Sequence, residues 1–493
     1  MRAEIARGAA WMVLFRLFDR AIGVISTTLL ARLLVPADFG LVAMAMSVIA
    51  VIELASAFSF EIALIQKPDP LREHFDTAWT LNILIAVAGA IVTAALAYPT
   101  ADFYGDPRLM PVMFAIGGAW LISGFESTGI ANFRREMNFS AEFRWMASKR
   151  VVSFVVTLIA ALAFRSYWAL VIGSVTGRIT GVAMSYAMHP FRPRFALSRS
   201  RELFSFSGWL LANNIAGVVL SRLPHFYIGR VFGAQALGAY SVGSEIAQLA
   251  HTELVAPINR AMFPGYARLV DDPETFRRVC IEATAAILLV VIPVSAGVAV
   301  LAAPMVRVLL GEHWADAVPV IQILAFAGAI SAVNSNNISA YLALGKPHLS
   351  TLILVARLLV FVGIVLGLAP GHAVVSVAYA ELGAAFASLV VSLPILFISL
   401  RLRARDYLAS LWRPLIASAL GAAGVHAVVT AIGHGDAFSG AALQLLAGVF
   451  VGLVLYPVAL WGLWWLSGRP LSVEPVLGRR IRQGLWGLVQ RNA

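Results

Sequence analysis

The stretch WMVLFRLFDRAIGVISTTLLARLLVPADFG (11–40) decides the fold, because its pattern returns about 200 residues later as WLLANNIAGVVLSRLPHFYIGRVFGAQALG (209–238). At one constant spacing, Trp11, Arg32 and Gly40 recur as Trp209, Arg230 and Gly238. Both copies lie in strongly apolar sequence, and internal repeats of this kind are common in membrane transporters. We therefore expect two membrane lobes that derive from one ancestral unit.

Composition identifies the chain as a polytopic membrane protein. Hydrophobic residues make up 60% of the 493 residues and charged residues 13%, and the mean hydropathy is +0.83. These values are too apolar for a soluble protein with an ordinary polar surface. Segments of roughly 20 residues, long enough to cross about 30 Å of hydrocarbon, predict about fourteen transmembrane helices. They lie near 9–34, 39–64, 77–99, 109–131, 148–165, 167–188, 205–228, 234–257, 281–303, 317–340, 349–368, 372–399, 412–433 and 440–466.

The distribution of Lys and Arg predicts the orientation in the membrane. If the N-terminus is cytoplasmic, the tails and alternate loops on the inside carry about 26 basic residues, against about four outside. Both termini are then cytoplasmic, as an even number of spans requires. Basic loops beside an anionic leaflet also account for the formal charge of +11, so we expect no nucleic-acid partner.

The repeat predicts the domain organisation. Because each unit contains six helices, the two copies enter the membrane in the same direction, and the pseudo-twofold axis that relates them runs along the membrane normal. The expected segments are a first lobe (1–188), a cytoplasmic connector and candidate hinge (189–204), a second lobe (205–399), two appended helices (400–466) and a cytoplasmic tail (467–493). Within the tail, 475–490 has the pattern of an interfacial amphipathic helix.

No catalytic or metal-binding motif is present, so we expect neither an enzyme nor a metal site. The sequence contains no HExxH, CxxC or GxSxG motif, and the single Gly-Lys pair, at Gly345 and Lys346, lacks the upstream glycine of a P-loop. The single cysteine, Cys280, rules out an internal disulfide and is expected to pack in the core.

Charged residues inside the spans are the best site candidates, because each is energetically unfavourable in a membrane and usually faces protein, water or substrate. Arg16, Asp19 and Arg20 fall on one face of the first expected helix. In one interpretation, Arg16 and Arg20 bind an anionic group such as a pyrophosphate, with Asp19 orienting one of them. In the other, Asp19 and Arg16 form an internal salt bridge with Glu53 or Glu61 of the next helix.

The seventh and eighth expected helices carry a second set of polar residues, which would form a wall opposite the first helix. This set comprises Asn213, Asn214, Arg222, Glu245 and Gln248. Such residues suit sugar hydroxyls or a proton relay, but each one singly is expected to serve as an interhelical hydrogen bond. Arg357 and Glu381, on neighbouring helices, are expected to pair with each other.

Seven segments have a characteristic sequence, order and spacing: ARLLVPADFGLVAMA (31–45), FYGDPRLMPVM (103–113), NFRREMNF (132–139), YWALVIG (167–173), FRPRF (191–195), LLGEHWADAVPVIQILA (309–325) and ALGKP (343–347). Together they resemble the polysaccharide and O-antigen flippases of the multidrug/oligosaccharidyl-lipid/polysaccharide exporter superfamily, in particular its colanic-acid-exporter-like branch. The resemblance extends from the first helix to about residue 400.

This resemblance implies a bacterial inner-membrane protein that translocates undecaprenyl-pyrophosphate-linked oligosaccharide repeat units by alternating access, for exopolysaccharide or O-antigen synthesis. It needs no cofactor, although coupling to H⁺ or Na⁺ fits the class. Membrane lipids and the polysaccharide polymerase and export machinery are the expected partners. Arg16 and Arg20 match the habit of this family of placing cationic residues in the cleft of the first lobe.

Two alternatives belong to the same superfamily: a cation-coupled multidrug exporter and a flippase for the peptidoglycan lipid precursor. Glu53, Glu61 and Glu245 are compatible with the exporter, whose sites are rich in carboxylates, but the arginines of the first helix argue against it. A membrane-embedded glycosyltransferase or polymerase would need a large outer loop with acidic residues. The outer loops here are no longer than about a dozen residues.

Overall fold

The computed structural model describes residues 2–53, 60, 64–65, 67, 70–368, 374–433 and 438–467, without the side chains of 2–10, 13, 203–216, 256, 260–261, 406 and 410. Within these residues the chain is helical and contains no strand, as predicted. Glu61 and the tail with its expected amphipathic helix (475–490) lie outside the described residues.

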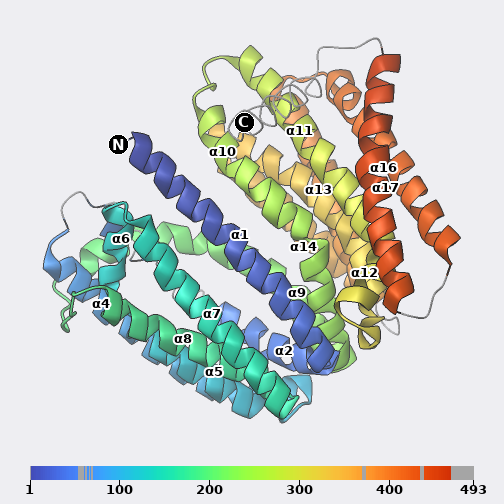
Figure 1. Ribbon diagram of the computed structural model, residues 1–493. Helices are drawn as coiled ribbons and strands as arrows, with labels where there is room; N and C mark the ends of the chain where they lie inside the picture. Colours follow the sequence, from blue (N-terminus) through green and yellow to red (C-terminus); the bar gives the residue numbers. More distant parts are fainter. Residues whose placement is uncertain are drawn as a thin grey trace, which may run out of the picture. The chain divides into compact units, whose positions relative to one another are not determined.

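Helices of the first half are α1 (Arg2–Leu33), α2 (Pro36–Glu53), α4 (Arg72–Tyr104), α5 (Leu109–Ser123), η2 (Thr128–Ile130), α6 (Ala131–Arg135), α7 (Phe139–Phe164), α8 (Trp168–Met188) and α9 (Ser200–Ala247). The second half contains η3 (His251–Val255), α10 (Ala256–Ala267), α11 (Pro273–Val300), α12 (Ala302–Leu309), η4 (Glu312–Trp314), α13 (Ala317–Ala343), α14 (Pro347–Leu368), α15 (Val375–Leu400), α16 (Ala404–Ile432) and α17 (Phe438–Leu466). Most of the predicted membrane segments match one helix each (Figure 1). The exceptions are 109–131, which is divided among α5, η2 and α6, the segments 205–228 and 234–257, which share α9, and 39–64, which extends beyond α2. By length and composition alone, nine helices of the described part could cross a membrane, or ten if one bent pair counts as a span.

The chain divides into two compact units. The first is Met1–Ser241 with Leu309–His313, and the second is Val242–Val308 with Trp314–Ala493. The boundary between the units, after Ser241, therefore lies inside the second copy of the repeat. The repeat itself predicts a first lobe that ends at 188 and a second lobe that begins at 205. In the first unit, α4 packs against α5, and α8 packs against both α5 and α7 (Figure 1).

The fourth predicted span is broken rather than continuous. The axis bends by 62° between Leu109–Ser123 and Thr128–Arg135. The intervening turn is held by side chains: Ser127 N donates to Ser185 Oγ of α8 (3.0 Å), and the Ser127 hydroxyl accepts from Gly129 N (3.3 Å). These hydrogen bonds replace backbone hydrogen bonds that a straight helix would form. Irregular backbone is tolerated here because its polar groups find partners within the protein.

A glycine divides α9 into two segments. Gly233 has φ 79° and ψ −175°, a backbone conformation that residues with a Cβ rarely adopt. The break coincides with the expected turn between the seventh and eighth spans. The second segment therefore begins at Ala234, the repeat counterpart of Pro36, at which α2 begins.

The connector between the predicted lobes is attached to α4. Its backbone amides at Arg194 and Ala196 donate to Asp76 Oδ1 (2.9 Å) and Thr80 Oγ1 (3.0 Å). At its end, hydrogen bonds from Lys67, then Arg199 and His74, lower the pKa of Glu202 to about 2. Extended backbone thus pairs with side chains on one face of α4, which fixes this segment to the first unit.

Polar side chains bind the helices of the second unit together. Asn334 and Asn337 of α13 donate to Ser388 and Ser392 of α15, each at 3.2 Å. The Tyr266 hydroxyl donates to Asn336 Oδ1 (2.9 Å). Between helices in a membrane, such bonds replace a hydrophobic driving force.

Two expectations for the second unit are confirmed. Arg357 Nη2 lies 3.1 Å from Glu381 Oε2, so these two residues form the predicted pair between α14 and α15. Cys280 is fully buried and packs in the core around Tyr266 and Tyr341.

Candidate functional site

Helix α1 is attached to α7 by an aromatic cluster in its N-terminal half. The Phe143 ring of α7 lies 5.2 Å from the ring of Trp11, 6.1 Å from that of Phe15 and 5.8 Å from that of Phe18, centroid to centroid. Aromatic side chains at these spacings share one face of α1, so the contact fixes the rotation of the helix about its axis. The charged residues that follow on α1 are positioned by this contact.

The first charged contact is an ion pair between α1 and α7. Arg150 Nε lies 2.9 Å from Asp19 Oδ1. The same guanidinium packs against Gly23, where a Cβ would be 3.1 Å from Arg150 Nη2. Arg16 and Arg20 are half-buried on α1 on either side of Asp19 in sequence. Asp19 therefore pairs with an arginine of α7, while the two arginines of α1 flank it in the sequence.

A second ion pair connects α2, α8 and α5. Arg178 Nη2 donates to Glu53 Oε1 (2.9 Å), and Arg178 Nη1 donates to Ser123 Oγ (3.2 Å). Arg178 and Glu53 are 24% and 32% exposed, respectively, so the pair is mostly shielded from solvent. The ion pair therefore lies beside Ser123, the last residue of α5.

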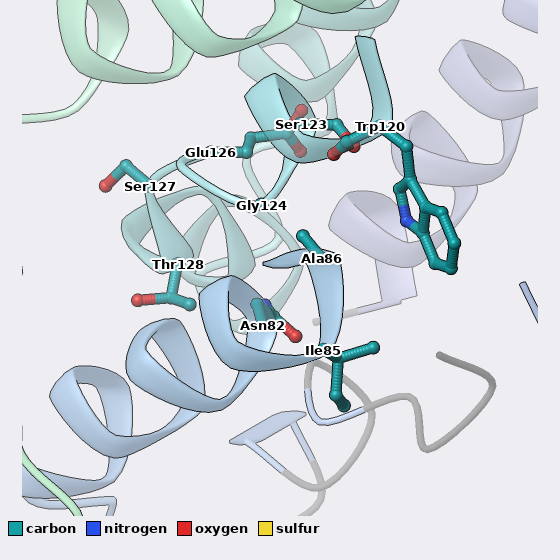
Figure 2. A pocket seen from close by; sticks show the side chains of 9 residues that line it. All are labelled: Asn82, Ile85, Ala86, Trp120, Ser123, Gly124, Glu126, Ser127 and Thr128. Carbon is teal, nitrogen blue, oxygen red and sulfur yellow. Dashed lines mark hydrogen bonds between the residues drawn. The ribbon is translucent and has the colours of Figure 1, made fainter. Parts of the chain in front are cut away.

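The break after α5 opens a polar cavity of about 240 Å³, shown in Figure 2. One wall comes from α4, and the other comes from the end of α5 and the turn that follows. The lining residues are Asn82, Ile85, Ala86, Trp120, Ser123, Gly124, Glu126, Ser127 and Thr128. Broken helices in transporters commonly line binding sites, because their irregular backbone needs polar or aqueous surroundings.

Glu126 is the acidic group at this cavity. Lys149 Nζ of α7 lies 3.3 Å from Glu126 Oε2 and 4.1 Å from the centroid of the Trp145 ring. The lysine is therefore held between a carboxylate and an aromatic face, and both attract a cation. Because Arg150 follows Lys149 on α7, the cavity and the Asp19 ion pair are adjacent along that helix.

The charged residues described above are Arg16, Asp19, Arg20, Glu53, Glu126, Lys149, Arg150 and Arg178, and the five basic ones outnumber the three acidic ones. A guanidinium group is suited to a phosphate or pyrophosphate group, which it can bind through two parallel hydrogen bonds. Within the described residues, no group of His, Cys, Asp or Glu could hold a metal ion.

The predicted site residues divide between the two units. Arg16, Asp19, Arg20, Glu53 and Arg222 belong to the first, and Glu245 and Gln248 are exposed in the second. Glu53 pairs with Arg178 and Asp19 with Arg150. The side chains of Asn213 and Asn214 lie outside the described residues, as does Glu61.

Sequence reasoning did not single out Arg150. The available signal was its position inside the expected span 148–165, where a charge is rare. Its pairing with Asp19 joins residues far apart in the chain, and no local pattern reveals such a pairing.

Comparisons with known proteins agree with this architecture. The succinoglycan biosynthesis transport protein ExoT of Rhizobium meliloti (strain 1021) is 25% identical over 468 residues, 92% of each chain. The lipopolysaccharide biosynthesis protein WzxC of Escherichia coli (strain K12) is 22% identical over 343 residues, 68% of this chain and 69% of that protein. Among solved structures, the lipid II flippase MurJ in its inward closed conformation has a TM-score of 0.71 at 12% identity, covering 92% of this chain and 99% of MurJ. That likeness concerns the fold.

A family model described as polysaccharide biosynthesis protein matches residues 29–319, more than half of the chain. The matched region contains several of the charged residues described above, including Glu53, Glu126, Arg150 and Arg178. The chain therefore belongs to the polysaccharide biosynthesis protein family.

Proposed function

We propose that this protein is a flippase that moves undecaprenyl-pyrophosphate-linked oligosaccharide repeat units across the bacterial inner membrane by alternating access. The observation that carries the proposal is the set of guanidinium groups that α1 and α7 contribute, those of Arg16, Arg20 and Arg150, in a helical membrane protein. Family membership and the transport roles named for its relatives support the substrate class. Both termini are cytoplasmic in this proposal, as the distribution of basic residues predicts.

Arg16 and Arg20 bind the pyrophosphate in the proposed mechanism, and Arg150 completes the site. Asp19 keeps the Arg150 guanidinium oriented, because their atoms lie 2.9 Å apart. Pyrophosphate carries more negative charge than Asp19, so it competes for the same donors when it enters. The lipid tail stays in the bilayer, and the glycan crosses between the lobes to reach the polymerase outside.

Ion coupling is proposed at the cavity beside α5. Glu126 and Asn82 line this cavity, and oxygen donors of this type suit a proton or Na⁺. Neutralising Glu126 would weaken its hold on Lys149, which connects cation uptake to the helix that carries Arg150. Proteoliposome transport with an imposed pH or Na⁺ gradient tests this proposal, and equal rates with and without each gradient would contradict it.

The test uses proteoliposomes that contain the full chain and lipid-linked oligosaccharides extracted from the source bacterium. The oligosaccharides are added to preformed proteoliposomes and therefore start in the outer leaflet. External periodate oxidises glycans in that leaflet only, so the protected fraction reports translocation. Each of Arg16→Ala and Arg20→Ala is expected to reduce the rate about 10- to 100-fold, since each removes charge-assisted hydrogen bonds of roughly 1.5–3 kcal/mol.

Arg108→Ala is the matched control, because Arg108 is an exposed arginine that pairs with Asp106 in a loop. Its rate should equal that of the parent. If the arginine variants of α1 transport like this control, the pyrophosphate site lies elsewhere. A parallel assay with purified peptidoglycan precursor separates the proposed substrate from that alternative.

A further inference from the structure

Helix α2 and the second segment of α9 touch through two glycines in their first turns. A Cβ built on Gly40 would overlap the carbonyl oxygen of Ala234 and lie 2.9 Å from Gly238 N. One built on Gly238 would overlap the carbonyl oxygen of Pro36 and lie 3.1 Å from Gly40 N. The contact is therefore backbone against backbone, and it requires the absence of a side chain on both helices.

The four contact residues are two pairs of repeat counterparts. Pro36 and Gly40 hold the positions in the first copy that Ala234 and Gly238 hold in the second. Each glycine meets the first residue of the other helix, which is the reciprocal pattern of a two-fold interface. The contact between the two helix starts therefore has local two-fold character.

Larger side chains surround the glycine contact. A Cβ on Gly229 would lie 2.6 Å from Tyr104 Cε1 and 3.2 Å from Met44 Cγ. Met44 is only 1% exposed. The Arg230 guanidinium carbon lies 5.7 Å from the centroid of the Phe103 ring. The ends of α2 and α4 are thus covered by α9, and Met44 is buried beneath that cover.

We propose that the contact between Gly40 and Gly238 is the extracytoplasmic gate of this transporter, closed in this structure. The proposal rests on the alternating-access function above. The distribution of basic residues places the turns before Pro36 and Ala234 on the outer side of the membrane. In the proposed mechanism this contact between the two copies of the repeat closes the outer side, and it must separate whenever that side opens.

Reversible cross-linking tests whether separation is needed for transport. The variant carries Phe103→Cys in the first repeat and Arg230→Cys in the second, in a Cys280→Ala background. A short bifunctional methanethiosulfonate bridges the two introduced cysteines. Bridging should reduce periodate-protected transport at least about tenfold, and reductant should restore it. The control is Asp106→Cys with Arg108→Cys, which bridges two positions within one outer loop and should leave transport unchanged. Transport that continues at the parental rate after bridging Phe103→Cys to Arg230→Cys would overturn the proposal.

Thiol labelling gives a readout that does not depend on the substrate. Met44→Cys, in the same Cys280→Ala background, reacts with a membrane-impermeant maleimide from outside only when the gate opens. Gly238→Ala disfavours the closed contact, so labelling should become about fivefold faster or more. Gly118→Ala is the control, because a Cβ there meets no atom within 4 Å. Equal labelling rates in Gly238→Ala and Gly118→Ala would overturn the gate. If Gly238→Ala labels faster but the parent protein transports no lipid-linked oligosaccharide, only the proposed substrate is refuted.

Discussion

Replacing either Glu53 or Arg178 should destabilise the first unit strongly. Replacing both residues should cost less stability than the sum of the two single losses. At 2.9 Å and an effective dielectric constant of about 20, the direct attraction is about 6 kcal/mol. Desolvation offsets much of this attraction. Removing one partner leaves a poorly solvated charge and should cost about 3 kcal/mol.

A double-mutant cycle isolates this pair. Glu53→Gln and Arg178→Met should each lower the thermal midpoint by about 6–12 °C, at roughly 2–4 °C per kcal/mol. The double variant should lose about 2 kcal/mol less than the sum of the single variants. The assay is thermal unfolding of the purified protein in detergent, followed by the monomer peak in size-exclusion chromatography.

The control for this cycle is an exposed pair of the same unit. Arg108, 54% exposed, lies 2.7 Å from Asp106, and Arg108→Met should cost less than about 1 kcal/mol. Additive losses in the cycle, within about 0.5 kcal/mol, would refute the reasoning that Glu53 and Arg178 stabilise the unit as a pair.

Three further predictions concern other contacts. The pKa of Glu202 is lowered from 4.5 to about 2. Its contribution to stability is therefore present above about pH 4.5 and is lost as the pH falls toward 2. The fall in thermal midpoint between neutral pH and about pH 3 should be smaller in Glu202→Gln than in the parent. A Cβ on Gly173 would overlap Thr157 Oγ1, so Gly173→Ala should lose about 1–3 kcal/mol by the same unfolding assay, whereas Gly118→Ala should lose none. Tyr266→Phe removes the donor to the buried Asn336 and should cost about 1–3 kcal/mol in that assay, which an unchanged midpoint would contradict.

The helices of this protein could be predicted from hydropathy because a membrane imposes a minimum apolar length on every span. The break after Ser123 could not, since the stabilising partner of Ser127 is Ser185 on a distant helix. The break at Gly233 could be predicted, because the glycine lies in the turn that the sequence predicts. Its positive φ explains why a glycine is found at this position.

For the site, the sequence located the charges but revealed only some of their pairings. Arg357 and Glu381 were predicted correctly because they lie on consecutive helices. The partner of Asp19 was missed because α1 and α7 are far apart in sequence and meet only through tertiary packing. The repeat identified Gly40 and Gly238 as counterparts, but their mutual contact follows only from the three-dimensional structure.

The most direct test of the central claim is translocation of lipid-linked oligosaccharide by the purified full chain in proteoliposomes. We predict that periodate-protected glycan accumulates with the parent protein and falls about tenfold or more when Arg16 and Arg20 are both replaced by alanine. No protection above that of protein-free vesicles, with the parent correctly folded, would contradict the account.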